Sequence, residues 1–212
     1  MKTKLICSAA IALLLLVVTN VSAGQSEVFI IKVADAISPG TADFINTGIK
    51  TAEEKAATVI IIELDTPGGL AESMRLIVQN ILASKVPVVV FVAPGGARAA
   101  SAGVMITMAA DVAAMAPGTN IGAAHPVGAG GKEIDGTMSE KIINDMVAQA
   151  KSVAEQRGRN AQWVEAAIRE SVSVTETEAL KENIIDLIAQ DTDDLIKQLN
   201  GRVLKNKGVL NL

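Results

Sequence analysis

The chain has 212 residues, of which 50% are apolar, 20% are charged and 2% are aromatic, and its formal net charge is −4. This composition excludes a disordered chain, because disorder combines low hydrophobicity with high net charge. One cysteine and one histidine exclude a disulfide scaffold and a clustered zinc site. The negative charge, without basic runs that carry aromatic residues, argues against a nucleic-acid partner. The length fits one α/β domain.

Residues 1–23 are predicted to be a secretory signal peptide. Two lysines precede an apolar run, Leu5–Val18, and the small residues Val21-Ser22-Ala23 provide a cleavage site. The run of 14 residues is shorter than the roughly 20 that span a bilayer, although an uncleaved anchor is the alternative. We therefore expect an exported, extracytoplasmic protein with one domain at 24–200 and a C-terminal tail at 201–212.

Three short, β-branched apolar runs predict strands buried on both faces, at Val28–Val33, Thr58–Leu64 and Pro87–Val92. Helical periodicity fills the segments between them, Thr41–Ala56 and Leu70–Ala83. This order predicts an α/β fold with a mostly parallel sheet and right-handed crossovers.

The rest of the chain continues this alternation. Helices are expected at Ser101–Ala110, Glu140–Arg157, Ala161–Glu170, Glu176–Glu182 and Thr192–Leu199, short strands at Asp111–Met115 and Ile184–Ile188, and a glycine-rich loop at Gly128–Gly136. Two helices carry apolar stripes predicted to face the core, namely Leu70, Met74, Ile77, Val78, Ile81 and Leu82 in one, and Ile143, Met146, Val147, Ala150, Val153 and Ala154 in the other.

Functional sites of parallel sheets form beyond the carboxyl ends of the strands. One loop in such a place is Asp65-Thr66-Pro67-Gly68-Gly69-Leu70, which follows the second strand and opens a helix. Its glycines leave backbone N–H groups uncovered at a helix N-terminus, an arrangement that stabilises negative charge. An ordinary tight turn is the alternative.

A second loop surrounds Ser101 with small residues, in the order Ala99-Ala100-Ser101-Ala102-Gly103. A serine among tiny neighbours at a strand-to-helix turn indicates a nucleophile elbow, although an N-cap serine is also common. A nucleophilic serine needs a base. The candidates are His125 and Lys141, of which Lys141 falls in the predicted first turn of its helix. A solvated lysine and a structural loop histidine are the alternatives.

Together these motifs resemble the N-terminal protease domain of NfeD-type membrane-associated serine proteases, relatives of signal peptide peptidase A and of the Clp protease. The resemblance runs from about Val28 to Leu199. It rests on both loops, on Met115–Gly122 and on Lys141 followed by Lys151-Ser152. It implies a Clp/crotonase-like fold.

The resemblance also implies a Ser–Lys dyad, with Ser101 as nucleophile and Lys141 as general base. The oxyanion hole would be formed by the N–H groups of Gly68 or Gly69 and of Ala102, with no metal or cofactor. The Clp histidine would fall on Ala124, one residue before His125. A Ser–His peptidase that uses His125 is therefore a weaker alternative.

The implied activity is that of an exported endopeptidase that cleaves apolar segments of membrane-associated proteins, with a stomatin-type protein as partner. A periplasmic or membrane-associated location and a homo-oligomer are expected with it. Two other functions remain open, a non-catalytic protease-like binding module and an acyl-CoA enzyme of the same superfamily.

Overall fold

The structure is a computed structural model that describes residues 27–128 and 136–212. The predicted signal peptide and residues 129–135 of the predicted glycine-rich loop lie outside the described residues.

The main sheet has five parallel strands in the order β1-β2-β3-β5-β8. These strands are β1 (Val28–Ala34), β2 (Val59–Asp65), β3 (Val88–Val92), β5 (Val112–Met115) and β8 (Leu187–Ile188). Both faces of the central strands are covered, and this double burial makes their sequences almost continuously apolar. The three predicted N-terminal strands are confirmed to within one residue at each end.

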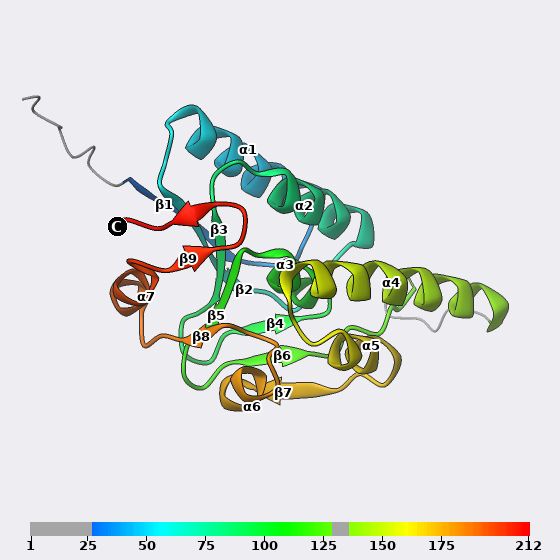
Figure 1. Ribbon diagram of the computed structural model, residues 1–212. Coiled ribbons are helices and arrows are strands. Elements are labelled where there is room, and N and C mark those ends of the chain that lie inside the picture. The colour runs from blue at the N-terminus through cyan, green and yellow to red at the C-terminus, as the bar shows by residue number, and fades with distance from the viewer. Residues whose placement is uncertain (1–26, 129–135) are drawn as a thin grey trace, which may run out of the picture.

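Helices cover the sheet on both faces (Figure 1). They are α1 (Pro39–Glu54), α2 (Ala71–Ala83), α3 (Ala102–Ala109), α4 (Gly136–Arg157), α5 (Ala161–Arg169), α6 (Glu176–Lys181) and α7 (Thr192–Leu199). Alternate residues of β2 divide between two cores, as the period of a strand requires. Ile60 and Ile62 pack in the larger core with α1 to α5, and Ile61 packs in the smaller core with α7.

The helices agree with the sequence patterns except at the two ends of α1, which ends at Glu54 rather than at Ala56, and at the start of α4. Helix α1 begins at Pro39, two residues before the predicted start, because Ser38 caps it by accepting a hydrogen bond from the Thr41 N–H at 3.2 Å. Helix α4 begins at Gly136 rather than at Glu140. The predicted strand at Ile184–Ile188 contains only the two residues of β8.

A second, smaller sheet was not predicted from the sequence. It consists of β4 (Arg98–Ala100), β6 (Asn120–Gly122) and β7 (Ser173–Thr175), in the order β4-β6-β7. Each strand has three residues, too few to show an alternating pattern. This sheet brings the segment before Ser101 beside residues that follow it by about twenty positions.

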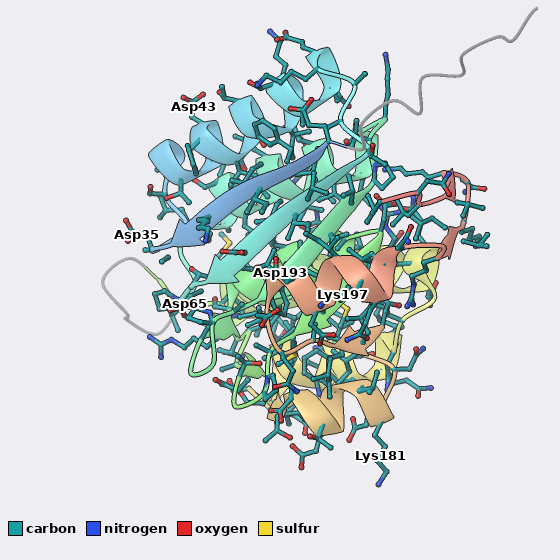
Figure 2. The ribbon with its side chains drawn as sticks, turned by 90° about the vertical axis from the view of Figure 1, so that its left-hand side faces the viewer. Asp35, Asp43, Asp65, Lys181, Asp193 and Lys197 are labelled. Carbon is teal, nitrogen blue, oxygen red and sulfur yellow. The ribbon has the colours of Figure 1, made fainter. Side chains whose placement is uncertain are left out.

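The predicted C-terminal tail is instead a hairpin of β9 (Val203–Leu204) and β10 (Gly208–Val209). Leu204 and Leu210 are buried in the smaller core with α7. In the loop of the hairpin, the Lys207 ammonium donates to Asp111 Oδ2 at 2.7 Å. The segment therefore completes one face of the main sheet. In Figure 2, Asp193 and Lys197 mark α7, which lies in front of the strands on this face.

Helix α3 runs through the middle of the larger core, and all eight of its residues are buried. The carbonyls at its C-terminal end therefore need partners within the protein. Arg157 donates to the Ala109 carbonyl at 2.8 Å, and Arg159 donates to those of Met108 at 2.9 Å and Ala110 at 2.8 Å. Two cations thus lie where the helix dipole favours positive charge.

Arg159 is buried and forms an ion pair with Asp186. Burial lowers the pKa of the Arg159 guanidinium, and the Asp186 carboxylate acts in the opposite direction. Asp186 in turn accepts a hydrogen bond from the Ala113 N–H of β5 at 2.7 Å. The pair therefore connects the end of α3 to the main sheet.

We expect Arg159→Ala to lower the free energy of unfolding by about 3–5 kcal/mol, because it leaves the partly buried Asp186 carboxylate and two buried helix carbonyls without this partner. Denaturant unfolding of the purified protein measures this change. The control is Arg169→Ala, which removes a more exposed ion pair and is expected to cost at most about 1 kcal/mol. Equal losses in the two variants would contradict the role of Arg159.

Candidate active site

Ser101 lies in a sharp turn between β4 and α3. Its backbone has φ 52° and ψ −111°, a conformation that costs a non-glycine residue roughly 1–3 kcal/mol. The Ser101 N–H donates to the Gly122 carbonyl at 3.0 Å, which fixes the turn to strand β6. Ser101 occupies the N-cap position of α3, but its side chain makes no capping hydrogen bond. The hydroxyl is therefore not used to stabilise the helix.

The turn is packed so closely that its glycines have no space for a side chain. A Cβ added to Gly68 would lie 2.5 Å from Ser101 Cβ and 3.1 Å from Ser101 Oγ. A Cβ added to Gly103 would lie 2.8 Å from Thr66 Cγ2. The crowding expected of a nucleophile elbow is therefore present on two sides of Ser101.

The three backbone N–H groups predicted to form an oxyanion hole differ in their hydrogen bonding. The Gly68 N–H donates to Thr66 Oγ1 at 3.1 Å. Gly69 pairs with Ile37 in a parallel bridge, whose two hydrogen bonds use the Gly68 carbonyl and the Leu70 N–H. This pattern directs the Gly69 N–H away from Ile37. Neither the Gly69 N–H nor the Ala102 N–H donates to a residue within the described ranges.

Thr66 was not singled out from the sequence, although it organises this loop. It is fully buried, and besides accepting from Gly68 its backbone pairs with β4. Its N–H donates to the Arg98 carbonyl at 2.8 Å, and its carbonyl accepts from the Ala100 N–H at 3.1 Å. A threonine before a Pro-Gly-Gly sequence is typical of a side-chain-stabilised turn, and this signal could have identified it.

An open groove of about 710 Å³ passes Ser101. It is mostly apolar, and its described lining comprises Pro67, Gly69, Leu70, Ala71, Met74, Ser101, Ala102, Ala123, His125, Pro126, Val127, Gly128, Met146 and Ser171. Leu70 was predicted to face the core, but it caps α2 with 58% of its surface exposed and lines this groove. A mostly apolar, concave surface of this size is a candidate binding site.

Lys141 does not line this groove. It lies in the second turn of α4, not in the predicted first turn, so the dipole of the helix acts on it less strongly. Its exposed side chain lines an adjoining cavity of about 290 Å³, together with Glu72 of α2 and Asp145. The two cavities share the four lining residues Ala71, Met74, Pro126 and Met146. Among the described residues, Lys141 has no partner in an ion pair.

The projection of α4 explains this exposure. The N-terminal turns of the helix, yellow-green in Figure 1, extend beyond the other elements. Its C-terminal half packs in the larger core through Val147, Ala150, Val153 and Ala154, as the apolar stripe predicted. Lys141 therefore belongs to the part of α4 that has fewest neighbours.

His125 lines the same groove as Ser101. Its Nδ1 is 2.9 Å from the Ile168 carbonyl oxygen of α5. Ala124, where the Clp histidine would fall, is fully buried. Among the described lining residues there is no carboxylate to complete a Ser–His–acid triad.

Lys151, the other lysine of the α4 motif, is held in an ion pair with Glu165 of α5 at 2.7 Å. Arg169 contacts the same carboxylate at 2.9 Å. The hydrogen bond from Lys151, followed by that from Arg169, lowers the pKa of Glu165. Lys151 therefore stabilises the packing of α4 on α5 and is not a free amine.

Comparison with known proteins places the chain in a family. The family model of the NfeD1b N-terminal domain matches residues 27–211. The chain belongs to this family. It is 42% identical over 184 residues to the membrane-bound protease PH1510 of Pyrococcus horikoshii, and 31% identical over 170 residues to the membrane protein NfeD1b of Bacillus subtilis. These alignments cover 85% and 80% of the chain, but only 41% and 37% of the two relatives. The chain thus spans less than half of their lengths.

Solved structures are also similar to this NfeD1b-type domain. One is a serine-to-alanine mutant of the 1510-N membrane-bound stomatin-specific protease, with a TM-score of 0.82 at 40% identity, covering 88% of this chain and 93% of that one. A lysine-to-alanine mutant of the same protease, in complex with a substrate peptide, also has a TM-score of 0.82 at 40% identity, with 89% of each chain covered.

A more distant structure, ClpP1 from Listeria monocytogenes, has a TM-score of 0.64 at 21% identity and covers 78% of this chain and 94% of that one. The predicted Clp-like fold is confirmed. Within residues 27–128 and 136–212, no cluster of potential metal ligands occurs, and no helix has the length and apolarity to cross a membrane.

We expect Gly103→Ala and Gly40→Ala to have opposite effects, although both glycines lie in helices. Gly103→Ala should lower the free energy of unfolding by about 1–3 kcal/mol, because the new methyl group would collide with Thr66. Gly40→Ala, whose nearest contact is ordinary at 3.8 Å, should raise it by up to about 1 kcal/mol. Denaturant unfolding measures both, and a change of the same sign in both variants would contradict the packing.

The lowered pKa of Glu165 makes the α4–α5 contact pH-dependent. Its stabilisation is fully present above the ordinary carboxyl pKa of 4.5 and is lost as the pH falls through the lowered value. We expect the difference in urea midpoint between wild type and Glu165→Gln to be largest above pH 4.5 and to shrink in stronger acid. Glu155→Gln, which removes an exposed charge from α4, serves as the control, and an identical pH profile in both variants would argue against this ion pair.

Proposed function

We propose that this domain is a serine endopeptidase in which Ser101 is the nucleophile and Lys141 is the general base. The observation that carries the proposal is the arrangement at the elbow. Ser101 has a strained backbone and a hydroxyl that caps no helix, and it lines an apolar groove beside the N–H groups of Gly69 and Ala102. The protease names of the relatives support the same activity.

In the proposed reaction, the uncharged Lys141 amine removes the proton from Ser101 Oγ, which attacks the peptide carbonyl. The N–H groups of Gly69 and Ala102 donate to the resulting oxyanion, and each donor of this kind lowers the barrier by about 3 kcal/mol. Gly69 is preferred to Gly68, because the Gly68 N–H already donates to Thr66. Lys141 then protonates the leaving amine, and water releases the acyl group.

The dyad requires Lys141 to turn toward the groove when a peptide is bound. The two cavities adjoin along shared residues, and the amine has no described ion-pair partner that would oppose this movement. Catalytic hydrogen bonds are often formed fully only in the substrate complex. A peptide in the groove would also shield the amine from water, which favours its uncharged form. The substrate complex of the relative's lysine-to-alanine mutant supports this role for a lysine.

The proposed substrates are apolar segments of membrane-associated proteins. The lining of the groove supports this class, because Leu70, Met74, Val127 and Met146 offer apolar contacts. A stomatin-type protein is the proposed partner, since the relatives of known structure are named stomatin-specific. Export through the signal at residues 1–23, a periplasmic or membrane-associated location and assembly into a homo-oligomer complete the proposal.

We expect Ser101→Ala and Lys141→Ala each to lower kcat/KM for a fluorogenic apolar peptide by at least about 1,000-fold. Each change should leave circular dichroism and unfolding unchanged, since neither side chain supports the fold.

The control is Lys181→Ala, which removes an exposed lysine on α6 at the lower edge of the molecule in Figure 2. It should cleave like wild type. Cleavage by Ser101→Ala at the wild-type rate would contradict the nucleophile, and unchanged cleavage by Lys141→Ala would contradict the base. A wild-type protein that binds the peptide but never cleaves it would instead indicate the binding module.

A further inference from the structure

The groove beside Ser101 contains one ionisable side chain among its described lining residues. This side chain is the imidazole of His125, and the other described residues are apolar, glycine or serine. Histidine changes its charge between about pH 5 and 8. Among the described lining residues, only His125 can therefore change the charge that the groove presents to a peptide.

The hydrogen bond to α5 determines which edge of the imidazole is available. The Ile168 carbonyl oxygen can only accept, so the Nδ1 at 2.9 Å carries the hydrogen. Ile168 belongs to the last turn of α5, where carbonyls have no partner within the helix. The Nδ1–H is present in both the neutral and the protonated imidazole. The ring thus keeps its anchor when it changes charge, and only Nε2 changes from acceptor to donor.

We propose that His125 determines the specificity of the groove, so that it accepts a carboxylate side chain of the peptide near the cleaved bond at mildly acidic pH and loses this preference at alkaline pH. The inference rests on the proposed peptidase function. A peptide in this largely apolar groove would displace water from a protonated imidazole, and a substrate carboxylate would supply the missing charge and hydrogen bond. The neutral imidazole presents a lone pair at Nε2 instead, which repels a carboxylate.

The other charged groups on the elements packed around His125 cancel one another or are already paired. We therefore assign the pH-dependent preference for a carboxylate largely to His125. The other charged groups are Glu72 and Arg75 of α2, Lys141 and Asp145 of α4, and Arg169 and Glu170 at the end of α5. The four groups of α2 and α4 line the adjoining cavity beyond Pro126, and their formal charges cancel. The Arg169 guanidinium is bonded to Glu165 and Asn144.

The experiment uses pairs of fluorogenic apolar peptides that differ only by Glu or Gln, placed in turn at each position next to the cleaved bond. The ratio of kcat/KM for Glu over Gln is measured at about pH 5.5 and pH 8, on either side of the range in which histidine titrates. This ratio cancels the pH dependence of the dyad. At one position we expect it to rise about tenfold on acidification, as a charge-assisted hydrogen bond allows.

The matched variant is His125→Gln, which keeps a polar side chain of similar reach but has no charge at either pH. It should still cleave the peptides and show the same Glu/Gln ratio of kcat/KM at both pH values. An equal pH-dependent rise in His125→Gln would overturn the inference. Loss of all cleavage in His125→Gln would also overturn it, because His125 would then act as the base.

Binding of the same peptides to Ser101→Ala, followed by fluorescence anisotropy, separates this inference from the proposed function. If the Glu/Gln ratio of Kd values changes with pH only when His125 is present, and the wild type cleaves nothing, the inference stands and the peptidase function fails. If wild type cleaves and neither ratio follows His125, the function stands and the inference fails. If no peptide binds at either pH, both fail.

Discussion

Helix α3 has no side exposed to solvent, so the backbone polar groups at both of its ends need hydrogen-bond partners other than bulk water. The terminal C=O and N–H groups of a buried helix cannot be left to water, so each end needs partners from the protein or from a ligand. At the C-terminal end, Arg157 and Arg159 supply them from a segment about fifty residues further along the chain. At the N-terminal end, the Ala102 N–H donates to no described residue and adjoins the groove. Hydrogen-bonding capacity is thus left open at the end of the helix where a substrate is proposed to bind.

The position of Ser101 depends on main-chain hydrogen bonds from the segments on either side of β4. Thr66 binds strand β4 just before the serine, and Gly122 accepts from the serine N–H itself. These bonds do not depend on which side chains line the groove. Side chains such as Leu70 or His125 can therefore differ without moving the nucleophile. This separation of chemistry from specificity is typical of sites in which loops are held by a rigid scaffold.

The parts of the fold that the sequence predicted are those with a strong periodic signal. Strand β2 is buried on both faces and reads as a continuous apolar run, and the stripe of α4 ends in the core as expected. The sheet β4-β6-β7 and the C-terminal hairpin were missed because their strands have two or three residues and are stabilised by distant pairing. Arg159 looks like a surface residue in sequence, and only its tertiary contacts reveal its burial.

In the candidate site, too, the features with a local sequence signal were predicted and those that depend on tertiary structure were not. The crowded serine and the glycine loop were recognisable because they depend on local sterics, and the structure places them in contact. The relation of Lys141 to Ser101 depends on where α4 begins and how far it projects, and neither property leaves a local pattern. The four extra residues at the start of α4 move Lys141 out of the first turn. The only local sign that Thr66 occupies the Gly68 N–H is the threonine that precedes Pro-Gly-Gly.

The backbone angles of Ser101 have an evolutionary consequence. Glycine adopts φ near 52° without the steric penalty that a serine bears there. The fold would therefore be more stable with glycine at this position, and selection for stability alone would remove the serine. A duplicated gene copy released from its enzymatic task would drift toward glycine at this site while keeping the rest of the turn. Among descendants of this chain, the residue at position 101 would thus show whether selection still acts on the enzymatic task as well as on stability.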